Sequence, residues 1–422
     1  MQCTSTRGAG PVSLAKALAE GLAPDGGLYV FPIDARPNVM LGTTLADTAT
    51  SLLTPLFHGE TLDAAALCHA AFTFDAPILP IDDDSFLLEL FHGPTAAFKD
   101  FGARFLAEAL SRIGLPPTTI LVATSGDTGA AVAAAFHRRP GFRVVILYPD
   151  GRVSARQAHQ LGAFGDNVRT FKVRGSFDDC QRLVKEAFAD KALVATHGLS
   201  SANSISLGRL LPQMAYYAHA SLVLKQRGLE PIDVIVPTGN LGNALACLMV
   251  KRLGLPIGHV TLASNANRVL PDFFSTGTYT PKPSVATLAN AMDVGAPSNL
   301  ERLRHWWPEL TALRHDVSAD SVDDETIRRT IGTVWRATRT AVCPHTACGV
   351  AVRDRLRAKG HRKPLLIAAT AHPAKFETVV EPLIGQPVEP PEALAKLLQK
   401  PAIATPLEPT LPALTAALTQ RR

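Results

Sequence analysis

At residues 91–100 the chain reads FHGPTAAFKD, which places one lysine, Lys99, in a loop of small residues just before a helical pattern. Two phenylalanines, Phe98 and Phe101, flank this lysine instead of other cations. An ε-amine forms an imine with a carbonyl cofactor only in its unprotonated form, and partial burial beside the two rings would lower its pKa in that direction. Lys99 is therefore the candidate covalent anchor of pyridoxal 5'-phosphate.

Short apolar runs bounded by turn residues recur along the chain, separated by helical patterns. The runs are Ile120 to Ala123, Val144 to Tyr148, Asp233 to Pro237, His259 to Ala263 and Leu365 to Ala369. Between them, Gly102 to Ile113 has the apolar face of a helix, and Gly129 to Phe136 is alanine-rich with no breaker. This alternation is typical of βαβ units, so the sequence predicts an α/β fold with parallel sheets.

The composition is that of a globular protein with a large core. The chain has 422 residues, 46% of them hydrophobic and 19% charged, which predicts two or more domains. Lysine plus arginine exceed aspartate plus glutamate by 42 to 37, and a dispersed net charge of +5 is too weak to indicate nucleic acid. We expect no nucleic-acid partner. A small anionic substrate suits this charge equally well.

The cysteines and the chain start indicate a compartment. Six cysteines are scattered without a paired framework, which favours free thiols in a reducing environment. The start has no apolar signal core, and the apolar stretches are far shorter than the roughly 20 residues that a bilayer crossing needs. We expect a cytoplasmic protein with no membrane partner. Cys343 and Cys348 lack the further ligands that a closed zinc site needs, so we expect no metal.

The lysine segment also carries a family resemblance. Gly93-Pro94-Thr95 followed by Phe98-Lys99-Asp100-Phe101-Gly102 resembles the cofactor-lysine segment of threonine synthases, and further segments between about residues 4 and 380 resemble the same family. The resemblance implies a tryptophan-synthase-β-like fold (fold type II), with two lobes of parallel or mixed sheets and helices on both faces. By analogy we expect a large domain at 1–95 and 205–385, a smaller mobile domain at 96–204, and a proline-rich tail at 386–422.

The segment from Thr124 to Gly129, which reads TSGDTG, follows a predicted strand and opens a predicted helix. A helix N-terminus concentrates partial positive charge, so an anion would bind there. The same residue types would also serve an ordinary helix cap with a tight glycine turn. In the resembling family this loop embraces the substrate and the cofactor ring. The resemblance therefore implies cofactor binding by Asp127 and substrate binding by Thr95, Ser125, Gly126 and Thr128.

A second loop, GNLGN, follows the predicted strand that ends at Pro237 and precedes a helical stretch. Its glycines would let the backbone approach an oxyanion, although an ordinary strand-to-helix turn needs the same pattern. It is neither a dinucleotide-binding fingerprint nor a Walker loop. The resemblance assigns the cofactor phosphate to the members of this loop, which are Gly239, Asn240, Leu241, Gly242 and Asn243. Leu241 stands where the family often has phenylalanine.

Two further segments complete the expected site. Arg209 offers a planar fork of donors suited to a phosphate, although a lone arginine on a helix is more often a surface or packing residue. The resemblance assigns the substrate phosphate to Asn203, Ser204 and Arg209. Thr370 ends an apolar run where a strand would face a ligand crevice, and the resemblance implies that its hydroxyl meets the cofactor's pyridine nitrogen. His372 and Lys375 can help to shape the site, but a structural histidine is the commoner case.

Other segments are less informative. Arg302, Arg304, Arg328 and Arg329 are expected on a solvated helical face, and the tail with its helical piece Glu392 to Leu398 is expected to pack on the surface. Cys343, where the family usually has an acidic residue before Pro-His, and Ala96, where leucine is common, are departures from the family pattern. Both leave the substrate fit open.

The resemblance implies a pyridoxal-phosphate-dependent lyase that converts O-phospho-L-homoserine and water into L-threonine and phosphate, the last step of threonine biosynthesis. Lys99 would be both anchor and base. One alternative is another lyase of the same cofactor class, such as a serine or threonine dehydratase, which needs no second phosphate site. Another is a non-catalytic homologue that binds a phosphorylated ligand. We expect a monomer or a homodimer.

Overall fold

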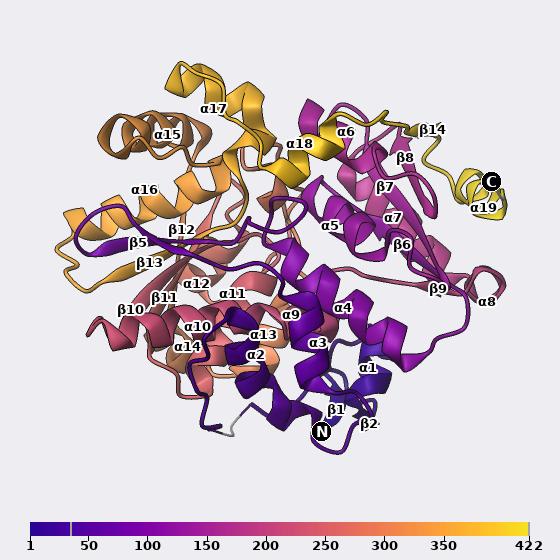
Figure 1. The fold of residues 1–422 in the computed structure, drawn as a ribbon, viewed down its shortest axis with the longest axis horizontal. Helices are drawn as coiled ribbons and strands as arrows, with labels where there is room; N and C mark the ends of the chain where they lie inside the picture. The colour runs from indigo at the N-terminus through magenta and orange to yellow at the C-terminus, as the bar shows by residue number, and fades with distance from the viewer. Residues whose placement is uncertain (34–35, 421–422) are drawn as a thin grey trace.

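The structure is a computed structural model that describes residues 1–33 and 36–420. Two sheets organise the chain into two lobes, and Figure 1 places the smaller lobe at the upper right with the C-terminus beside it. A small N-terminal sheet lies at the bottom of the same view. It consists of β1 (Gln2–Ser5), β2 (Val12–Ser13) and β3 (Tyr29–Val30), paired antiparallel in the order β2-β1-β3.

The sheet of the larger lobe has the order β12-β11-β10-β13-β5-β4. All neighbouring strands are parallel except β4 and β5. The strands are β4 (Ile78–Pro80), β5 (Ser85–Glu89), β10 (Ile232–Pro237), β11 (Ile257–Ser264), β12 (Val317–Ser321) and β13 (Leu365–Ala369). Successive strand residues point to opposite faces. Val234 and Leu366 therefore join one buried core, and Ile235 and Ile367 join a second core on the other face.

Helices cover both faces of this sheet. The helices around the first core are α1 (Leu14–Glu20), α2 (Leu45–Leu53), α3 (Ala64–Ala71), α9 (Leu207–Leu210), α10 (Gln213–Gln226), α11 (Gly242–Arg252), α12 (Val269–Thr276), α13 (Leu300–Trp306) and α14 (Leu310–Asp316). The second core packs α15 (Asp324–Thr338), α16 (Pro344–Ala358) and α17 (Glu377–Ile384) on the opposite face. Three short 3₁₀ turns are η1 (Thr54–Phe57), η2 (Asn290–Met292) and η3 (Pro373–Phe376).

The smaller lobe is built on a parallel sheet of the order β14-β8-β7-β6-β9. Its strands are β6 (Thr118–Ala123), β7 (Phe142–Pro149), β8 (Val168–Val173), β9 (Leu199–Ser200) and β14 (Thr405–Leu407). One face packs on α4 (Lys99–Ile113), α5 (Asp127–Phe136) and α6 (Ala155–Gly162), and the other on α7 (Phe177–Ala189), α8 (Lys191–His197) and α19 (Leu411–Thr419).

The C-terminal segment crosses from the larger lobe to the smaller one. After α17 it forms α18 (Glu392–Leu398), which contacts α6, and then β14 pairs with β8 as the edge strand of the smaller sheet. The Ile403 amide donates to the Gly162 carbonyl at 3.0 Å. A Cβ at Gly162 would lie 2.9 Å from the Ile403 nitrogen, so glycine is needed for this approach. The domain limits expected from the sequence stay a prediction.

The α/β architecture is confirmed. Each of the five apolar runs forms the expected strand, and the predicted helices at 102–113, 129–136 and 392–398 are present. All six cysteines are buried free thiols. Among the described residues no helix is both long and apolar enough to cross a membrane.

One expectation about the surface is wrong. Arg302 is fully buried, although Arg304, Arg328 and Arg329 are exposed as expected. Its Nε donates to the Tyr29 carbonyl at 3.0 Å, so the N-terminal sheet covers the side of α13 that was expected to face solvent. Burial lowers the pKa of this guanidinium to about 9.

Candidate active site

Lys99 is the first residue of α4, and its loop is fixed on the end of β13. The Phe98 amide donates to the Thr370 carbonyl at 2.9 Å, and the His372 amide donates to the Ala96 carbonyl at 3.0 Å. Ala96 adopts a positive φ of 56°, which lets the loop turn into the helix. Lys99 therefore lies at the carboxyl edge of the larger sheet, which is where α/β proteins bind their ligands.

The amine of Lys99 is partly buried, and its Nζ lies 5.6 Å from the centroid of the Phe98 ring. Burial lowers its pKa to about 8, helped by the nearby charges of Arg209 and Lys375 and opposed by Asp127. The expected direction of the shift is thus present. The sequence neighbours of Lys99 are not cationic, but the fold brings two cations near it.

Asp100 shapes the loop in front of the lysine. Its buried carboxylate accepts hydrogen bonds from the Thr95 amide at 2.8 Å and from the Thr95 hydroxyl at 2.6 Å. A Cβ at Gly93 would lie 2.5 Å from the Asp100 Oδ2, so this position needs glycine. Because the Thr95 hydroxyl is held as a donor, only its oxygen lone pairs are left to meet a substrate group.

The TSGDTG segment forms a tight turn at the start of α5. The Thr124 hydroxyl accepts from the Gly126 amide at 3.0 Å and from the Gly129 amide at 2.8 Å, and Gly126 adopts a φ of 128°. The Gly126 amide is therefore already hydrogen-bonded within the turn and is not available to a ligand. Ser125 precedes the N-cap residue Gly126, and Thr128 lies in the first turn of the helix, where amides have no partner within the helix. Both the capping reading and the anion reading are compatible with this geometry.

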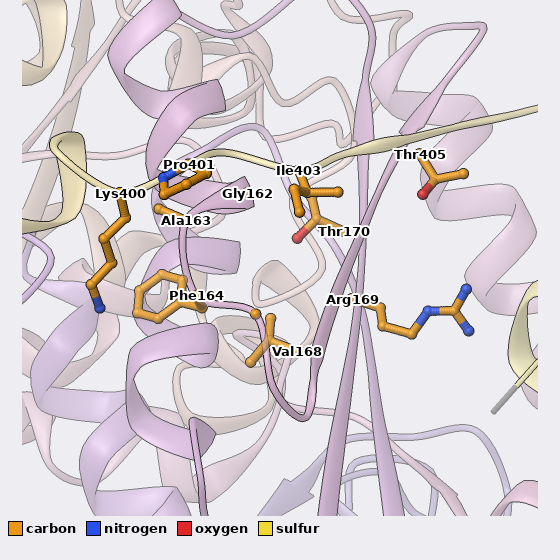
Figure 2. A pocket seen from close by; sticks show the side chains of 11 residues that line it. Gly162, Ala163, Phe164, Val168, Arg169, Thr170, Lys400, Pro401, Ile403 and Thr405 are labelled. Atoms are coloured by element: carbon orange, nitrogen blue, oxygen red, sulfur yellow. The ribbon is translucent and has the colours of Figure 1, made fainter. Parts of the chain in front are cut away.

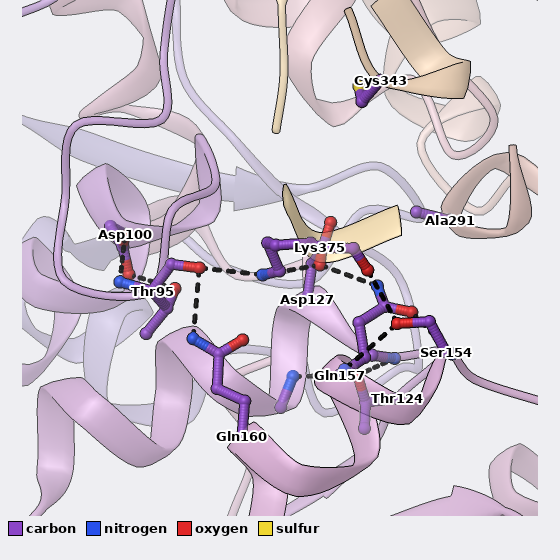
Figure 3. A network of polar contacts seen from close by, with 12 residues as sticks. Thr95, Asp100, Thr124, Asp127, Ser154, Gln157, Gln160, Ala291, Cys343 and Lys375 are labelled. Atoms are coloured by element: carbon purple, nitrogen blue, oxygen red, sulfur yellow. Dashed lines mark hydrogen bonds and ion pairs between the residues drawn. The ribbon is translucent and has the colours of Figure 1, made fainter. Parts of the chain in front are cut away.

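Asp127 is buried at the start of α5 between two lobes (Figure 3). Its Oδ1 accepts from Gln157 Nε2 at 2.9 Å and forms an ion pair with Lys375 Nζ at 2.8 Å. Burial alone would raise the pKa of this carboxyl. The charges of Lys375 and Lys99 outweigh burial and hold the pKa well below its usual range.

The GNLGN loop joins β10 to α11 through a strained residue. Leu241 adopts a positive φ of 64°, and its amide donates to the Thr238 hydroxyl at 3.2 Å. A Cβ at Gly239 would meet the Met292 backbone at 2.8 Å, whereas a Cβ at Gly242 would meet nothing closer than the Asn299 amide nitrogen at 3.7 Å. Gly242 therefore has room for a small group in ordinary van der Waals contact at the N-terminus of α11, where an oxyanion cradle would lie.

The two asparagines of this loop play different parts. Asn240 Nδ2 donates to the Ser204 hydroxyl at 2.7 Å, which joins this loop to the segment before α9. Asn243 Oδ1 accepts from the hydroxyls of Tyr216 at 3.0 Å and Tyr217 at 2.6 Å, so its side chain points toward α10. The Asn243 Nδ2 has no hydrogen-bond partner among the described residues, and the Asn243 backbone amide lies in the first turn of α11.

Arg209 is buried on α9, with 2% of its surface exposed. Its Nη1 donates to the Ala202 carbonyl at 2.5 Å, and its Nε is without a hydrogen-bond partner within the part of the chain that is described. A Cβ at Gly102 would lie 2.8 Å from the Arg209 carbonyl oxygen, so a glycine on α4 permits the close approach of α9. Burial lowers the pKa of this guanidinium to about 10. A buried cation with an unused donor is suited to an anion.

Asn203 and Ser204 lie in the turn that precedes α9. The Asn203 amide donates to the Ser201 hydroxyl at 3.2 Å, and its carbonyl accepts from the Ser206 amide at 3.1 Å. Ser204 contacts the GNLGN loop as described above. The structure thus brings the expected substrate-phosphate segment and the expected cofactor-phosphate loop into direct contact.

Thr370 follows β13 and is buried. Its hydroxyl makes no hydrogen bond within residues 1–33 and 36–420, while its carbonyl holds the lysine loop. His372 caps η3 by accepting from the Ala374 amide at 3.2 Å, and burial lowers its pKa to about 4. His372 is therefore a structural helix cap, and a structural role was the commoner of the two roles considered for it from the sequence.

Sequence reasoning missed several side chains that complete the site. Gln157, Gln160 and Asn299 come from distant segments and hydrogen-bond predicted residues. Asn290 hydrogen-bonds Gln157, and the charges of Asp127 and Lys99 act on His345. His345 Nε2 accepts from the Ala291 amide at 3.1 Å, which places the proton on Nδ1, 3.8 Å from Cys343 Sγ. Burial lowers the pKa of this imidazole to about 4. In the sequence, only the motif Cys343-Pro344-His345 drew attention to this histidine.

Cys343 takes the place of the acidic residue that the family usually has, and it caps α16. Its Sγ accepts from the Thr346 amide at 3.4 Å. A thiol is a weak acceptor compared with a carboxylate, but the capping contact is kept. This departure therefore leaves the position of His345 intact.

A hollow of about 330 Å³ lies elsewhere in the described chain. Figure 2 shows it on the smaller lobe, beneath the C-terminal residues 400–405, with Phe164, Val168 and Ile403 in its lining. None of the site residues expected from the sequence lines it. The residues expected to form the site therefore lie apart from this hollow.

Comparisons with known proteins agree with this geometry. Residues 77–369 match the family of pyridoxal-phosphate dependent enzymes, and residues 346–417 match the threonine synthase C-terminal family. The chain is 41% identical to threonine synthase of Escherichia coli, covering 96% of this chain and 95% of the relative. It is 40% identical to that of Haemophilus influenzae, covering 94% of each.

Solved structures give the same result. The crystal structure of Escherichia coli threonine synthase superposes with a TM-score of 0.90 at 37% identity and covers 99% of both chains. The structure of pyridoxal-phosphate-bound threonine synthase from Brucella melitensis has a TM-score of 0.90 at 33% identity, covering 99% of this chain and 98% of that one. The fold type II architecture expected from the sequence is thereby confirmed.

Proposed function

Because this chain belongs to the threonine synthase family, we propose that it converts O-phospho-L-homoserine and water into L-threonine and phosphate, with Lys99 as anchor and base. The chain is a pyridoxal-phosphate-dependent lyase. The specific substrate and the part of each residue are the proposal. The observation that carries it is Arg209, a buried guanidinium with an unused Nε whose charge is close enough to lower the pKa of Lys99.

The residues present fit the cofactor. The room beside Gly242 at the N-terminus of α11 suits a phosphate, and the Thr370 hydroxyl has no other partner among the residues described. The amides of Gly242 and Asn243 would hold the phosphate, with Gly239, Asn240 and Leu241 forming the turn. Asp127 and Thr370 would border the ring. When bound, pyridoxal phosphate supplies an electron sink for negative charge at the substrate's α-carbon.

Lys99 would do the proton transfers. Its lowered pKa of about 8 leaves a usable fraction of free amine near neutral pH, as a general base requires. With its amine free, Lys99 Nζ would take the proton from the substrate's Cα and then a proton from Cβ. Phosphate would leave Cγ with the electrons of the C–O bond, a proton would be added at Cγ, water would supply the hydroxyl at Cβ, and a proton would finally return to Cα.

The substrate's own phosphate would be held apart from the cofactor's. Arg209 supplies charge-assisted donors, and Asn203 and Ser204 supply polar groups beside it. Thr95, Ser125, Gly126 and Thr128 would receive the amino-acid end at the start of α4 and α5. A dehydratase of the same fold needs no second phosphate site, so the unused donor of Arg209 supports the phosphorylated substrate.

The test is to incubate the purified holoenzyme with O-phospho-L-homoserine and to measure phosphate and threonine in the same samples. Equimolar release is the expected result, and Lys99→Ala is the matched control without activity. Phosphate without threonine, or neither product from a cofactor-loaded protein, would contradict the proposal. The expected monomer or homodimer is read from the sedimentation of the same preparation.

A further inference from the structure

Lys375 is a buried lysine that the proposed chemistry does not use. It lies on η3 of the larger lobe, with 1% of its surface exposed. Its Nζ forms an ion pair with Asp127 Oδ1 at 2.8 Å and donates to the Thr95 carbonyl at 2.8 Å (Figure 3). One ammonium therefore holds the start of α5, on the smaller lobe, and the loop that leads to Lys99.

The backbone of Lys375 is bound to the smaller lobe as well. Its carbonyl accepts from the Ser154 hydroxyl at 2.7 Å, and Ser154 caps α6. From that helix Gln157 reaches Asp127, and Gln160 donates to the Thr95 carbonyl at 3.2 Å. The two oxygen atoms that bind the Lys375 ammonium thus each also accept a hydrogen bond from a glutamine side chain of α6. η3, α5 and α6 therefore form one polar network.

The other charges around this network come from separate elements. Lys99 and Asp100 face it from α4, Arg209 from α9, and His345 from α16. His372 precedes Lys375 on the same turn. Asp127 is the anion paired directly with Lys375, and it is also the carboxylate that acts on Lys99. Without the Lys375 charge, Asp127 would therefore have no ion-pair partner, and its negative charge would raise the pKa of the Lys99 amine.

We propose that Lys375 is a positioning residue for the anchor lysine: its ammonium holds Asp127 and the Thr95 carbonyl across the lobe boundary and keeps the Lys99 amine in its reactive, unprotonated form. The inference rests on the proposed anchor role of Lys99. It predicts that Lys375 acts through charge as well as packing. A residue that only filled space would affect stability without affecting the protonation of Lys99.

The test mixes apoprotein with pyridoxal phosphate and follows the rate at which the visible absorbance appears, across a pH series. The pH of half-maximal rate reports the Lys99 amine, and for the unaltered chain it is expected near the pKa of about 8. In Lys375→Met this midpoint should rise by about one pH unit or more, because a neighbouring cation is lost and Asp127 is left unpaired. In Lys375→Met/Asp127→Asn it should return toward the original value.

Three further measurements keep the outcome decisive. Lys375→Arg retains the charge and should keep the midpoint within about 0.3 pH units of the original, a displacement far smaller than one close charge produces. Lys396→Met removes the same side chain from an exposed pair with Glu392 and should change nothing. The thermal midpoint of the apoprotein should fall in Lys375→Met and recover in part in the double variant, because the unpaired buried charge is gone.

An unchanged pH midpoint in Lys375→Met would overturn the proposal, whatever the thermal midpoint does. Failure of the proposed function looks different. In that case Lys99→Ala apoprotein would still develop the visible absorbance, and the pH series would not be reporting Lys99.

Discussion

The Gly242→Ala variant distinguishes two hypotheses for the GNLGN loop, a phosphate-binding loop and an ordinary strand-to-helix turn. The added Cβ would meet nothing closer than 3.7 Å, so the fold has room for it. Gly242 is the first residue of α11, and alanine is favoured over glycine in a helix by up to about 1 kcal/mol. The free energy of unfolding of the apoprotein should therefore be unchanged or slightly higher.

Cofactor binding should respond in the opposite direction. If the phosphate rests on the Gly242 amide, the methyl group occupies space that the phosphate needs, and overpacking costs about 1–3 kcal/mol. At 1.4 kcal/mol for each factor of ten, the Kd of pyridoxal phosphate should rise about 5- to 150-fold. The assay is a titration of apoprotein with pyridoxal phosphate, paired with urea unfolding of the same apoprotein.

Gly239→Ala is the matched comparison within the same loop. Its Cβ would lie 2.8 Å from the Cα and the carbonyl oxygen of Met292, which are backbone atoms that cannot rotate away. This variant should lose about 1–3 kcal/mol of unfolding free energy before any cofactor is added. A Gly242→Ala protein that binds pyridoxal phosphate as tightly as the original would refute the assignment of the cradle.

Three other perturbations test the site. Lys99→Ala should abolish the visible absorbance of the loaded protein, and a variant that stays yellow and active would show that the anchor is elsewhere. Arg209→Met should raise KM for O-phospho-L-homoserine about tenfold or more, because charge-assisted hydrogen bonds contribute about 1.5–3 kcal/mol. The Kd of pyridoxal phosphate should stay nearly constant. An unchanged KM would show that Arg209 does not bind the substrate. Burial lowers the pKa of His345 from its ordinary value of 6.5 to about 4, so between these values the folded state binds fewer protons than the unfolded state. The free energy of unfolding should therefore fall as pH drops through that window. His345→Gln, which keeps an acceptor for Ala291, should flatten this fall in urea unfolding measured between about pH 7 and pH 4, and an unaltered slope would contradict the buried neutral imidazole.

The strands that the sequence predicts well are those buried on both faces. β6, β7, β10, β11 and β13 are continuous apolar runs, and burial on both faces of a parallel sheet requires that pattern. The edge strands are short or half-exposed, as β12 and β14 are, and their residues have no such pattern. Pairing partners far away in the sequence decide these strands, so local reasoning missed them.

The site shows the same division. Lys99, the TSGDTG turn and the GNLGN turn are local motifs, and their glycines and hydroxyls make the backbone contacts that such turns require. Arg302 was misplaced because helical spacing does not tell which side of α13 the N-terminal sheet covers. The ion pair of Lys375 with Asp127 depends on the two lobes meeting, and Gln157 reaches Asp127 from another helix of the smaller lobe. No pattern within these segments predicts either contact.

The most direct test of the account is to reduce the loaded protein with borohydride and to map the modified peptide by mass spectrometry. Reduction fixes the cofactor permanently on the lysine that holds it. A single pyridoxyl group on Lys99 is the expected result. A pyridoxyl group on Lys375, the other lysine buried at the lobe junction, or on any further lysine would contradict it.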